Sequence, residues 1–172
     1  MKVLVAYQSR YGSTKQYAEW IQERFQAAII DLNQNIPNYS DYDIIVLGSY
    51  LHAGSIQIAK HLVQNWELIK EKEVILFTCS AMPTDNSRIK KIYEKDLPQE
   101  IREKTKCFPL CGKIIHEYLN LMDKILMFVG TAIEKDSEMK KGMKTDYDGL
   151  KQENLIPLYG YISELIDTNK NR

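Results

Sequence analysis

Hydrophobic positions along the chain fall into short continuous runs that alternate with amphipathic stretches. Five runs predicted to be strands lie at residues 2–8, 27–32, 43–49, 73–79 and, more weakly, 106–113. Between them apolar residues recur at helical spacing, which predicts helices over residues 13–26, 59–66 and 87–104, the last broken at Pro98. Strands that are apolar on both faces and alternate with helices are typical of a parallel sheet covered on both sides.

Right-handed crossovers between these strands predict a doubly wound α/β sheet of five strands with the order 2-1-3-4-5. Pro109 lies inside the fifth run, which indicates an edge strand because proline cannot donate to the strand ladder. We treat residues 1–172 as a single domain, closed by a helix around residues 155–165. In this strand order a ligand binds at the carboxyl ends of strands 1 and 3, where three loops meet.

The first of these loops, SRYGST at residues 9–14, joins the first strand to the first helix. The hydroxyls of Ser9, Ser13 and Thr14 can donate to phosphate oxygens, and Gly12 allows the backbone to approach closely. The same groups could also form an ordinary helix N-cap. The loop matches neither the Walker sequence nor the dinucleotide-binding glycine pattern.

The sequence S-x-x-G-S-T after a first strand resembles the phosphate loop of the flavodoxin family. This resemblance implies a flavodoxin-like domain that holds the phosphate of FMN with hydroxyls and backbone amides. It also implies that GSYLHAG at residues 48–54 covers one face of the flavin and that residues 79–84 bond its polar edge. The implied cofactor-binding residues are Ser9, Arg10, Tyr11, Gly12, Ser13, Thr14, Ser49, Tyr50, Leu51, His52, Ala53, Gly54, Cys79, Ser80, Ala81 and Met82.

The residue types in these loops point to no catalytic set or metal site. His52 is the one histidine in the loops and is either a proton partner beside the flavin or a residue of an exposed loop. Cys79, Cys107 and Cys111 lack the spacing of a redox or zinc motif, and we expect them to pack as small apolar residues. Their odd number without paired spacing indicates a reducing compartment. The third loop also lacks the aromatic residue that stacks on flavin in short carrier flavodoxins.

A further apolar pattern follows the fifth strand. Residues 115, 118, 119, 122, 125, 126 and 129 are apolar at helical spacing, which predicts an extra amphipathic helix over residues 115–129. This segment resembles the inserted helix of flavodoxin-type protoporphyrinogen oxidase, a quinone-linked flavoprotein family. Its apolar face could serve core packing, a homodimer, a substrate or peripheral membrane contact. We expect Asp123 and Lys124 on its polar side and a charged surface loop over residues 135–149.

Charge and hydropathy exclude several classes of partner. Lys and Arg number 23, equal to Asp and Glu, so no overall field attracts nucleic acid. No run of eighteen residues is free of charge, and the first residues are typical of a strand and turn rather than an export signal. We therefore expect a cytoplasmic protein, with association at the inner face of a membrane as an alternative.

Taken with the resemblance, these features predict an FMN-dependent oxidoreductase that passes electrons from a small-molecule substrate to a quinone. The resemblance names protoporphyrinogen IX of haem biosynthesis as that substrate. The alternative is a flavodoxin-type electron carrier between redox proteins, although such carriers are typically acidic and this chain has zero net charge. A flavin-free signalling domain ranks last, because only Asp31, Asp41 and Asp43 lie near the strand ends.

Overall fold

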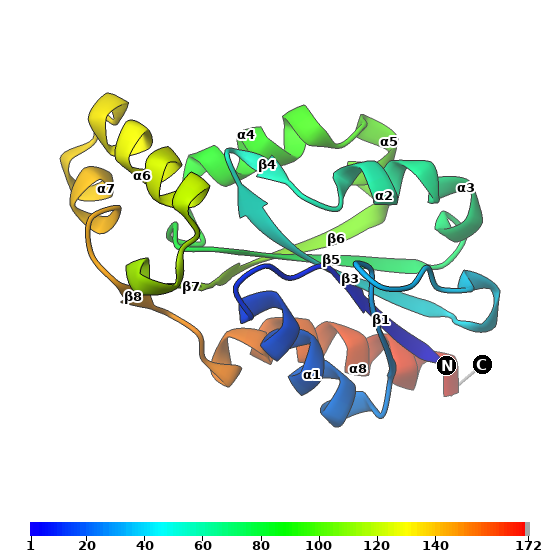
Figure 1. Cartoon of the computed structure of the whole chain (residues 1–172). Helices are drawn as coiled ribbons and strands as arrows, with labels where there is room; N and C mark the ends of the chain where they lie inside the picture. The colour runs from blue at the N-terminus through cyan, green and yellow to red at the C-terminus, as the bar shows by residue number, and fades with distance from the viewer. Residues whose placement is uncertain (171–172) are drawn as a thin grey trace.

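A parallel sheet forms the centre of the computed structural model, which describes residues 1–170 (Figure 1). Its strands are β1 (Val3–Tyr7), β2 (Ala28–Asp31), β3 (Ile44–His52), β5 (Glu73–Ser80) and β6 (Thr105–Cys111). They are arranged in the order β2-β1-β3-β5-β6, and every neighbouring pair is parallel. Because β4 is only a short strand paired with β3, this order confirms the predicted 2-1-3-4-5 arrangement. The strand carrying Pro109 lies at the edge, as predicted.

Helices cover both faces of the sheet (Figure 1). On one face lie α1 (Ser13–Phe25) and α8 (Ile156–Lys170); on the other lie α2 (Ala59–Gln64), α3 (Trp66–Ile69), α4 (Ser87–Asp96) and α5 (Gln99–Lys104). Successive residues of β1 point to opposite faces, so Val5 packs against α1 and α8 while Leu4 packs against the other layer. Both are fully buried, which explains why the strand sequence is apolar throughout. Short 3-10 turns lie at Tyr39–Asp41, His116–Tyr118 and Gln152–Leu155.

The second rim segment is a β-hairpin rather than the predicted loop after residue 49. Strand β3 continues to His52 and returns through Ala53 and Gly54 into β4 (Ser55–Ile56). Both turn residues have positive φ, 50° and 70°, as two-residue hairpin turns of this kind require. Two residues of α4 hold the hairpin: Lys95 donates to the carbonyl of Gly54 at 2.5 Å, and Asp96 accepts from the amide of Ile56 at 2.6 Å.

The segment after β6 differs most from the sequence prediction. The predicted helix over residues 115–129 is wrong at its start, because α6 spans Leu121–Ile133 and is preceded by β7 (Lys113–Ile114) and a 3-10 turn. Asn120 fixes the start of α6 by accepting from the amide of Asp123 at 2.8 Å. The predicted loop over residues 135–149 contains α7 (Ser137–Gly142) and β8 (Tyr147–Asp148), which pairs with β7.

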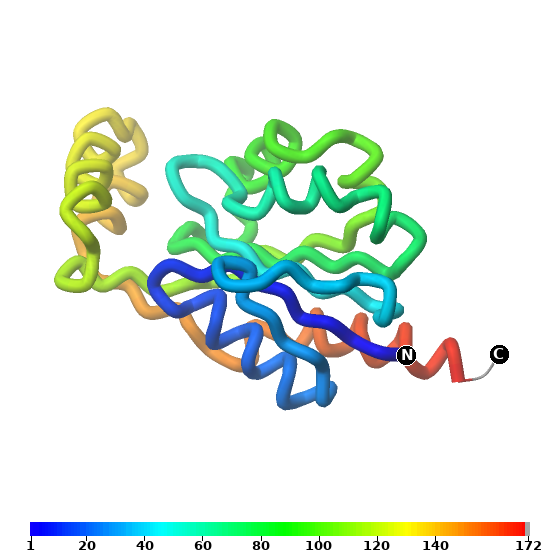
Figure 2. The backbone as a smooth tube through the Cα atoms, turned by 45° about the vertical axis from the view of Figure 1, so that its right-hand side comes forward, coloured from blue at the N-terminus to red at the C-terminus, as the bar shows by residue number. Residues whose placement is uncertain are grey.

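Helices α6 and α7 stand together at one end of the molecule, beyond the carboxyl ends of the strands (Figures 1 and 2). The predicted helix over residues 59–66 is divided into α2 and α3 at Asn65. Over residues 1–170, none of the helices combines the length and the apolar character that a membrane span needs.

Candidate functional site

A pocket opens at the carboxyl ends of β1, β3 and β5, where the three predicted loops meet. Its lining also includes residues from β7 and α6. The predicted binding residues that line it are Ser9, Arg10, Tyr11, Ser13, Thr14, Tyr50, Leu51, His52, Ala53, Cys79, Ser80 and Ala81. The remaining lining residues are Gly112, Lys113, Ile114, Leu119, Asp123, Leu126 and Met127. The fold therefore brings all three loops to one pocket, while four predicted residues lie outside its lining.

The loop from β1 to α1 presents hydroxyl and backbone amide donors, and its one cationic side chain, Arg10, is paired with Asp123. Gly12 is the N-cap of α1, with a φ of 93°, and it offers no side chain to satisfy the amides of the first helical turn. Ser9 Oγ accepts from the amide of Gly12 at 3.2 Å, and Ser13 Oγ accepts from the amide of Lys113 at 3.1 Å. Each hydroxyl uses its oxygen as an acceptor in these bonds, so its own proton remains available to an anion.

Four of the six predicted residues of the second loop, Tyr50 to Ala53, line the pocket. The first and the last of the six, Ser49 and Gly54, do not. Ser49 is fully buried behind the pocket, where its hydroxyl donates to the carbonyl of Tyr50 at 3.1 Å and accepts from the amide of Ile58 at 3.3 Å. Its role here is structural. Gly54 lies at the outer turn of the hairpin, where its positive φ rather than contact with the pocket requires glycine.

The third segment supplies the floor of the pocket at the end of β5. Burial raises the pKa of Cys79 to about 12, so its thiol stays protonated and unreactive. Met82, predicted to contact the cofactor, instead packs toward the core against the α2–α5 layer, and its amide donates to Ser80 Oγ at 3.2 Å. Gly112 donates to the carbonyl of Ser80 at 2.6 Å, and a side chain at this position would lie only 3.3 Å from that oxygen.

One carboxylate connects α6 to two of the three loops. Asp123 Oδ2 accepts from the Tyr11 hydroxyl at 2.5 Å and pairs with the Arg10 guanidinium at 2.9 Å. Its Oδ1 is 2.8 Å from His52 Nε2. Burial works against the charge, but the hydrogen bonds from Tyr11 and His52 and the nearby Arg10 hold the pKa of Asp123 below its ordinary value. Asp123 is therefore an ionised group inside the pocket wall, with only 5% of its surface exposed.

Residues 4–141 match the family described as flavodoxin domain, which covers most of the sequence. The chain belongs to the flavodoxin domain family. Among the curated proteins compared with it, none matches significantly.

The solved structures similar to this chain include three flavoproteins. A flavoprotein in complex with FMN from Lactobacillus acidophilus NCFM is 19% identical, with 64% of this chain and 91% of that chain covered and a TM-score of 0.47. A flavodoxin from the domain Archaea is 15% identical, with coverage of 68% and 87% and a TM-score of 0.45. Oxidised flavodoxin 2 from Bacillus cereus is 17% identical, with coverage of 83% and 92% and a TM-score of 0.46.

In this flavodoxin domain, α6 turns its polar side toward the pocket and most of its apolar side outward. Asp123, expected on the polar side of the helix, is buried against the pocket. Most of its apolar side chains are exposed to solvent, namely Leu121, Met122, Ile125, Phe128, Val129 and Ile133. Leu126 is 41% exposed and also lines the pocket. Periodicity shows that a helix has two faces but not which face meets the protein. The one local signal for the buried carboxylate is the Asn120-x-x-Asp123 spacing of an N-terminal cap.

Proposed function

We propose that this flavodoxin domain binds FMN in the pocket and uses it for redox chemistry. The observation that carries the proposal is the uncapped first turn of α1 beside two hydroxyls that retain a proton to donate. A helix N-terminus with free amides and a positive dipole end favours a phosphate. These hydroxyls and amides are neutral donors, and they lie at the strand switch point where this sheet topology binds ligands.

The pocket residues also fit the ring of a flavin. Tyr50, Leu51 and Ala53 of the hairpin supply apolar and aromatic surface, and the backbone around Ser80 and Ala81 can bond a polar ring edge. From α6, Leu126 and Met127 complete an apolar wall that the sequence alone had left open. We infer that residues 9–14 would hold the phosphate and that the hairpin, residues 79–81 and α6 would surround the ring.

We further propose that the domain is an oxidoreductase rather than an electron carrier. FMN, when bound, supplies the electron transfer, while the protein binds and orients the reactants. The wall formed by α6 favours a small apolar reactant over direct contact with a large protein partner. The substrate class proposed is protoporphyrinogen, with a quinone as the electron acceptor. No pocket residue is assigned as a catalytic acid or base.

The outer surface of α6 supports a lipid-dissolved acceptor. Its exposed apolar residues lie on the same helix whose other side lines the pocket, so peripheral contact with a membrane would bring a quinone close to that pocket. A homodimer formed through the same face is the competing arrangement. Both arrangements would use the exposed face of α6, Leu121–Ile133.

Reconstitution of the purified protein with FMN, followed by anaerobic turnover of protoporphyrinogen with menaquinone, tests the proposal. The visible flavin spectrum reports loading, and porphyrin fluorescence reports turnover. Tyr50→Ala should reduce turnover, whereas Tyr118→Ala, which removes an exposed tyrosine outside the pocket, should not. Bound flavin without porphyrin formation would favour the electron carrier. If the protein binds no FMN, the whole proposal is refuted, because every later step depends on the bound cofactor.

A further inference from the structure

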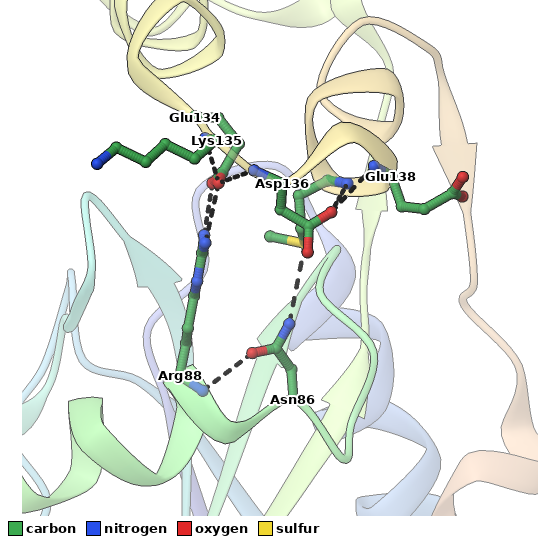
Figure 3. Close-up of polar contacts among 7 residues, drawn as sticks. Asn86, Arg88, Glu134, Lys135, Asp136 and Glu138 are labelled. Carbon is green, nitrogen blue, oxygen red and sulfur yellow. Dashed lines mark hydrogen bonds and ion pairs between the residues drawn. The ribbon is translucent and has the colours of Figure 1, made fainter.

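Helix α6 is fastened to the rest of the domain by one carboxylate at each end. Near its start, Asp123 contacts Arg10, Tyr11 and His52. Just after its end, Glu134 forms a bidentate ion pair with Arg88, in which the two guanidinium nitrogens lie 2.5 and 2.9 Å from the two carboxylate oxygens (Figure 3). Glu134 also accepts from the amides of Lys135 and Asp136, both at 2.9 Å, which fixes the turn into α7. The two anchors are separated by about 16 Å along the helix axis.

The two anchors differ in what they hold. Glu134 joins α6 to the start of α4 and lies outside the pocket lining. Asp123, in contrast, lies in the lining and contacts three other lining residues, which come from the β1–α1 loop and the β3–β4 hairpin. A property that depends only on the position of α6 should change when either Asp123 or Glu134 is substituted. A property that depends on the pocket residues should change only when Asp123 is substituted.

The hydrogen bonds of Asp123 determine where His52 carries its proton. An ionised carboxylate can only accept, so the ring nitrogen that faces it, Nε2, must be a donor. A neutral His52 therefore carries its hydrogen on Nε2, and Nδ1 is left as the acceptor nitrogen of a ring that lines the pocket. The other carboxylate oxygen is already committed to donors from Tyr11 and Arg10, so the carboxylate cannot simply turn away from His52.

We propose that Asp123 is a positioning residue of this pocket, which fixes His52 in the Nε2–H form and holds Arg10 and Tyr11 beside it. Its charge also balances that of Arg10 at the pocket wall. The inference about the redox pocket rests on the proposed FMN function. The tautomer of His52 is a property of the protein without any ligand. The positioning role of Asp123 and the proposed FMN function can therefore be refuted independently.

The first test uses the protein without FMN. Nitrogen-15 NMR of the histidine rings, measured where His52 is neutral, should show a protonated Nε2 and an unprotonated Nδ1. Assignment is direct because the chain has three histidines and a His52→Gln variant removes one signal set. A native ring with its hydrogen on Nδ1 would overturn the proposal without any need for a variant to fold.

Asp123→Asn gives the sharper comparison. The single amide oxygen should remain with Tyr11 and Arg10, because both are donors, and the amide NH2 then faces His52 Nε2. This arrangement forces the ring hydrogen onto Nδ1, the same exchange of tautomers that an Asp-to-Asn change produces in serine proteases. Glu134→Gln removes the same charge from the other anchor and should leave the tautomer of His52 unchanged. Identical tautomers in all three proteins would refute the positioning role.

With FMN bound, the midpoint potential provides a second readout. Asp123→Asn removes a negative charge from the pocket wall and leaves Arg10 unbalanced, so the potential should become more positive. Glu134→Gln should not change it, because Glu134 lies outside the pocket lining and about 16 Å along the helix axis from Asp123. Equal shifts in both variants would show that closure of α6, rather than Asp123, sets the potential. If FMN fails to bind while the tautomers behave as expected, the positioning role stands and the proposed function fails.

Discussion

Replacement of Gly12 by alanine tests whether the phosphate-loop geometry is built into the protein without a ligand. Gly12 has a φ of 93°, and a Cβ added there would meet no atom within 4 Å. Crowding therefore contributes nothing, and the whole penalty comes from backbone strain. A left-handed conformation costs an alanine about 1–2 kcal/mol. Alanine also restricts the unfolded chain, which returns about 0.4–1 kcal/mol. We expect a net loss of about 1 kcal/mol in the free energy of unfolding.

Gly160 provides the matched control because it carries the same substitution in a different backbone conformation. It lies inside α8, where an added Cβ likewise meets no atom within 4 Å. Alanine favours a helix interior over glycine by about 0.5–1 kcal/mol, so Gly160→Ala should stabilise the protein. Urea unfolding of the FMN-free proteins measures both changes through shifts of the midpoint at constant slope.

The free energy of unfolding should therefore fall in Gly12→Ala and rise in Gly160→Ala. Should Gly12→Ala prove as stable as the native protein, the left-handed loop would not be required by the fold, and the argument for a preformed anion site would fail. We also expect Gly12→Ala to weaken FMN binding, because relief of the strain displaces the amides of the first turn of α1. Gly160→Ala should bind FMN like the native protein, as measured by quenching of flavin fluorescence.

Three other outcomes follow from the structure. The Arg88 hydrogen bonds, helped by the amides of Asp136 and Lys135, lower the pKa of Glu134 to about 2. The stabilising pair should therefore be lost only as the pH falls from about 4.5 toward 2; limited proteolysis of the α6–α7 segment should rise over that window, and Arg88→Ala should weaken the dependence. Burial raises the pKa of Cys79 to about 12, so this thiol should resist alkylation at pH 8 in the native protein and react after unfolding, as followed by mass spectrometry. Phe128→Ser should change the free energy of unfolding by less than about 0.5 kcal/mol while reducing vesicle co-sedimentation; an unchanged vesicle-bound fraction would argue against membrane contact through α6.

The sheet could be predicted from the sequence because its signals are local. Val3–Tyr7 are all buried, and a strand buried on both faces is apolar at consecutive positions. The strand order and the position of Pro109 at the edge then followed from handedness and hydrogen-bonding rules. Because parallel strands end at one rim, the same reasoning placed all three loops at the pocket. Whether those residues contact FMN stays a prediction.

The features that were missed depend on contacts between distant parts of the chain. The hairpin that extends β3 to His52 is held by Lys95 and Asp96, about forty positions further along the sequence. The orientation of α6 depends on the Tyr11–Asp123 hydrogen bond, which joins residues 112 positions apart. Neither contact has a signature in the local pattern of apolar and polar residues. The packing of Met82 against the core could not be foreseen for a related reason, since a loop residue can turn toward the core as readily as toward a ligand.

The exposed apolar face of α6 has a consequence for function. A helix normally gains its stability by burying an apolar face, but the apolar side chains of α6, such as Phe128 with 76% of its surface exposed, remain in solvent. Polar anchors at Asp123 and Glu134 hold the helix instead, and these two contacts replace the broad apolar interface that holds the other helices. We therefore expect α6 to open at a lower free energy than the sheet, as elements with few buried apolar contacts do. Since α6 also forms a wall of the pocket, any ligand that packs against that wall should stabilise the helix.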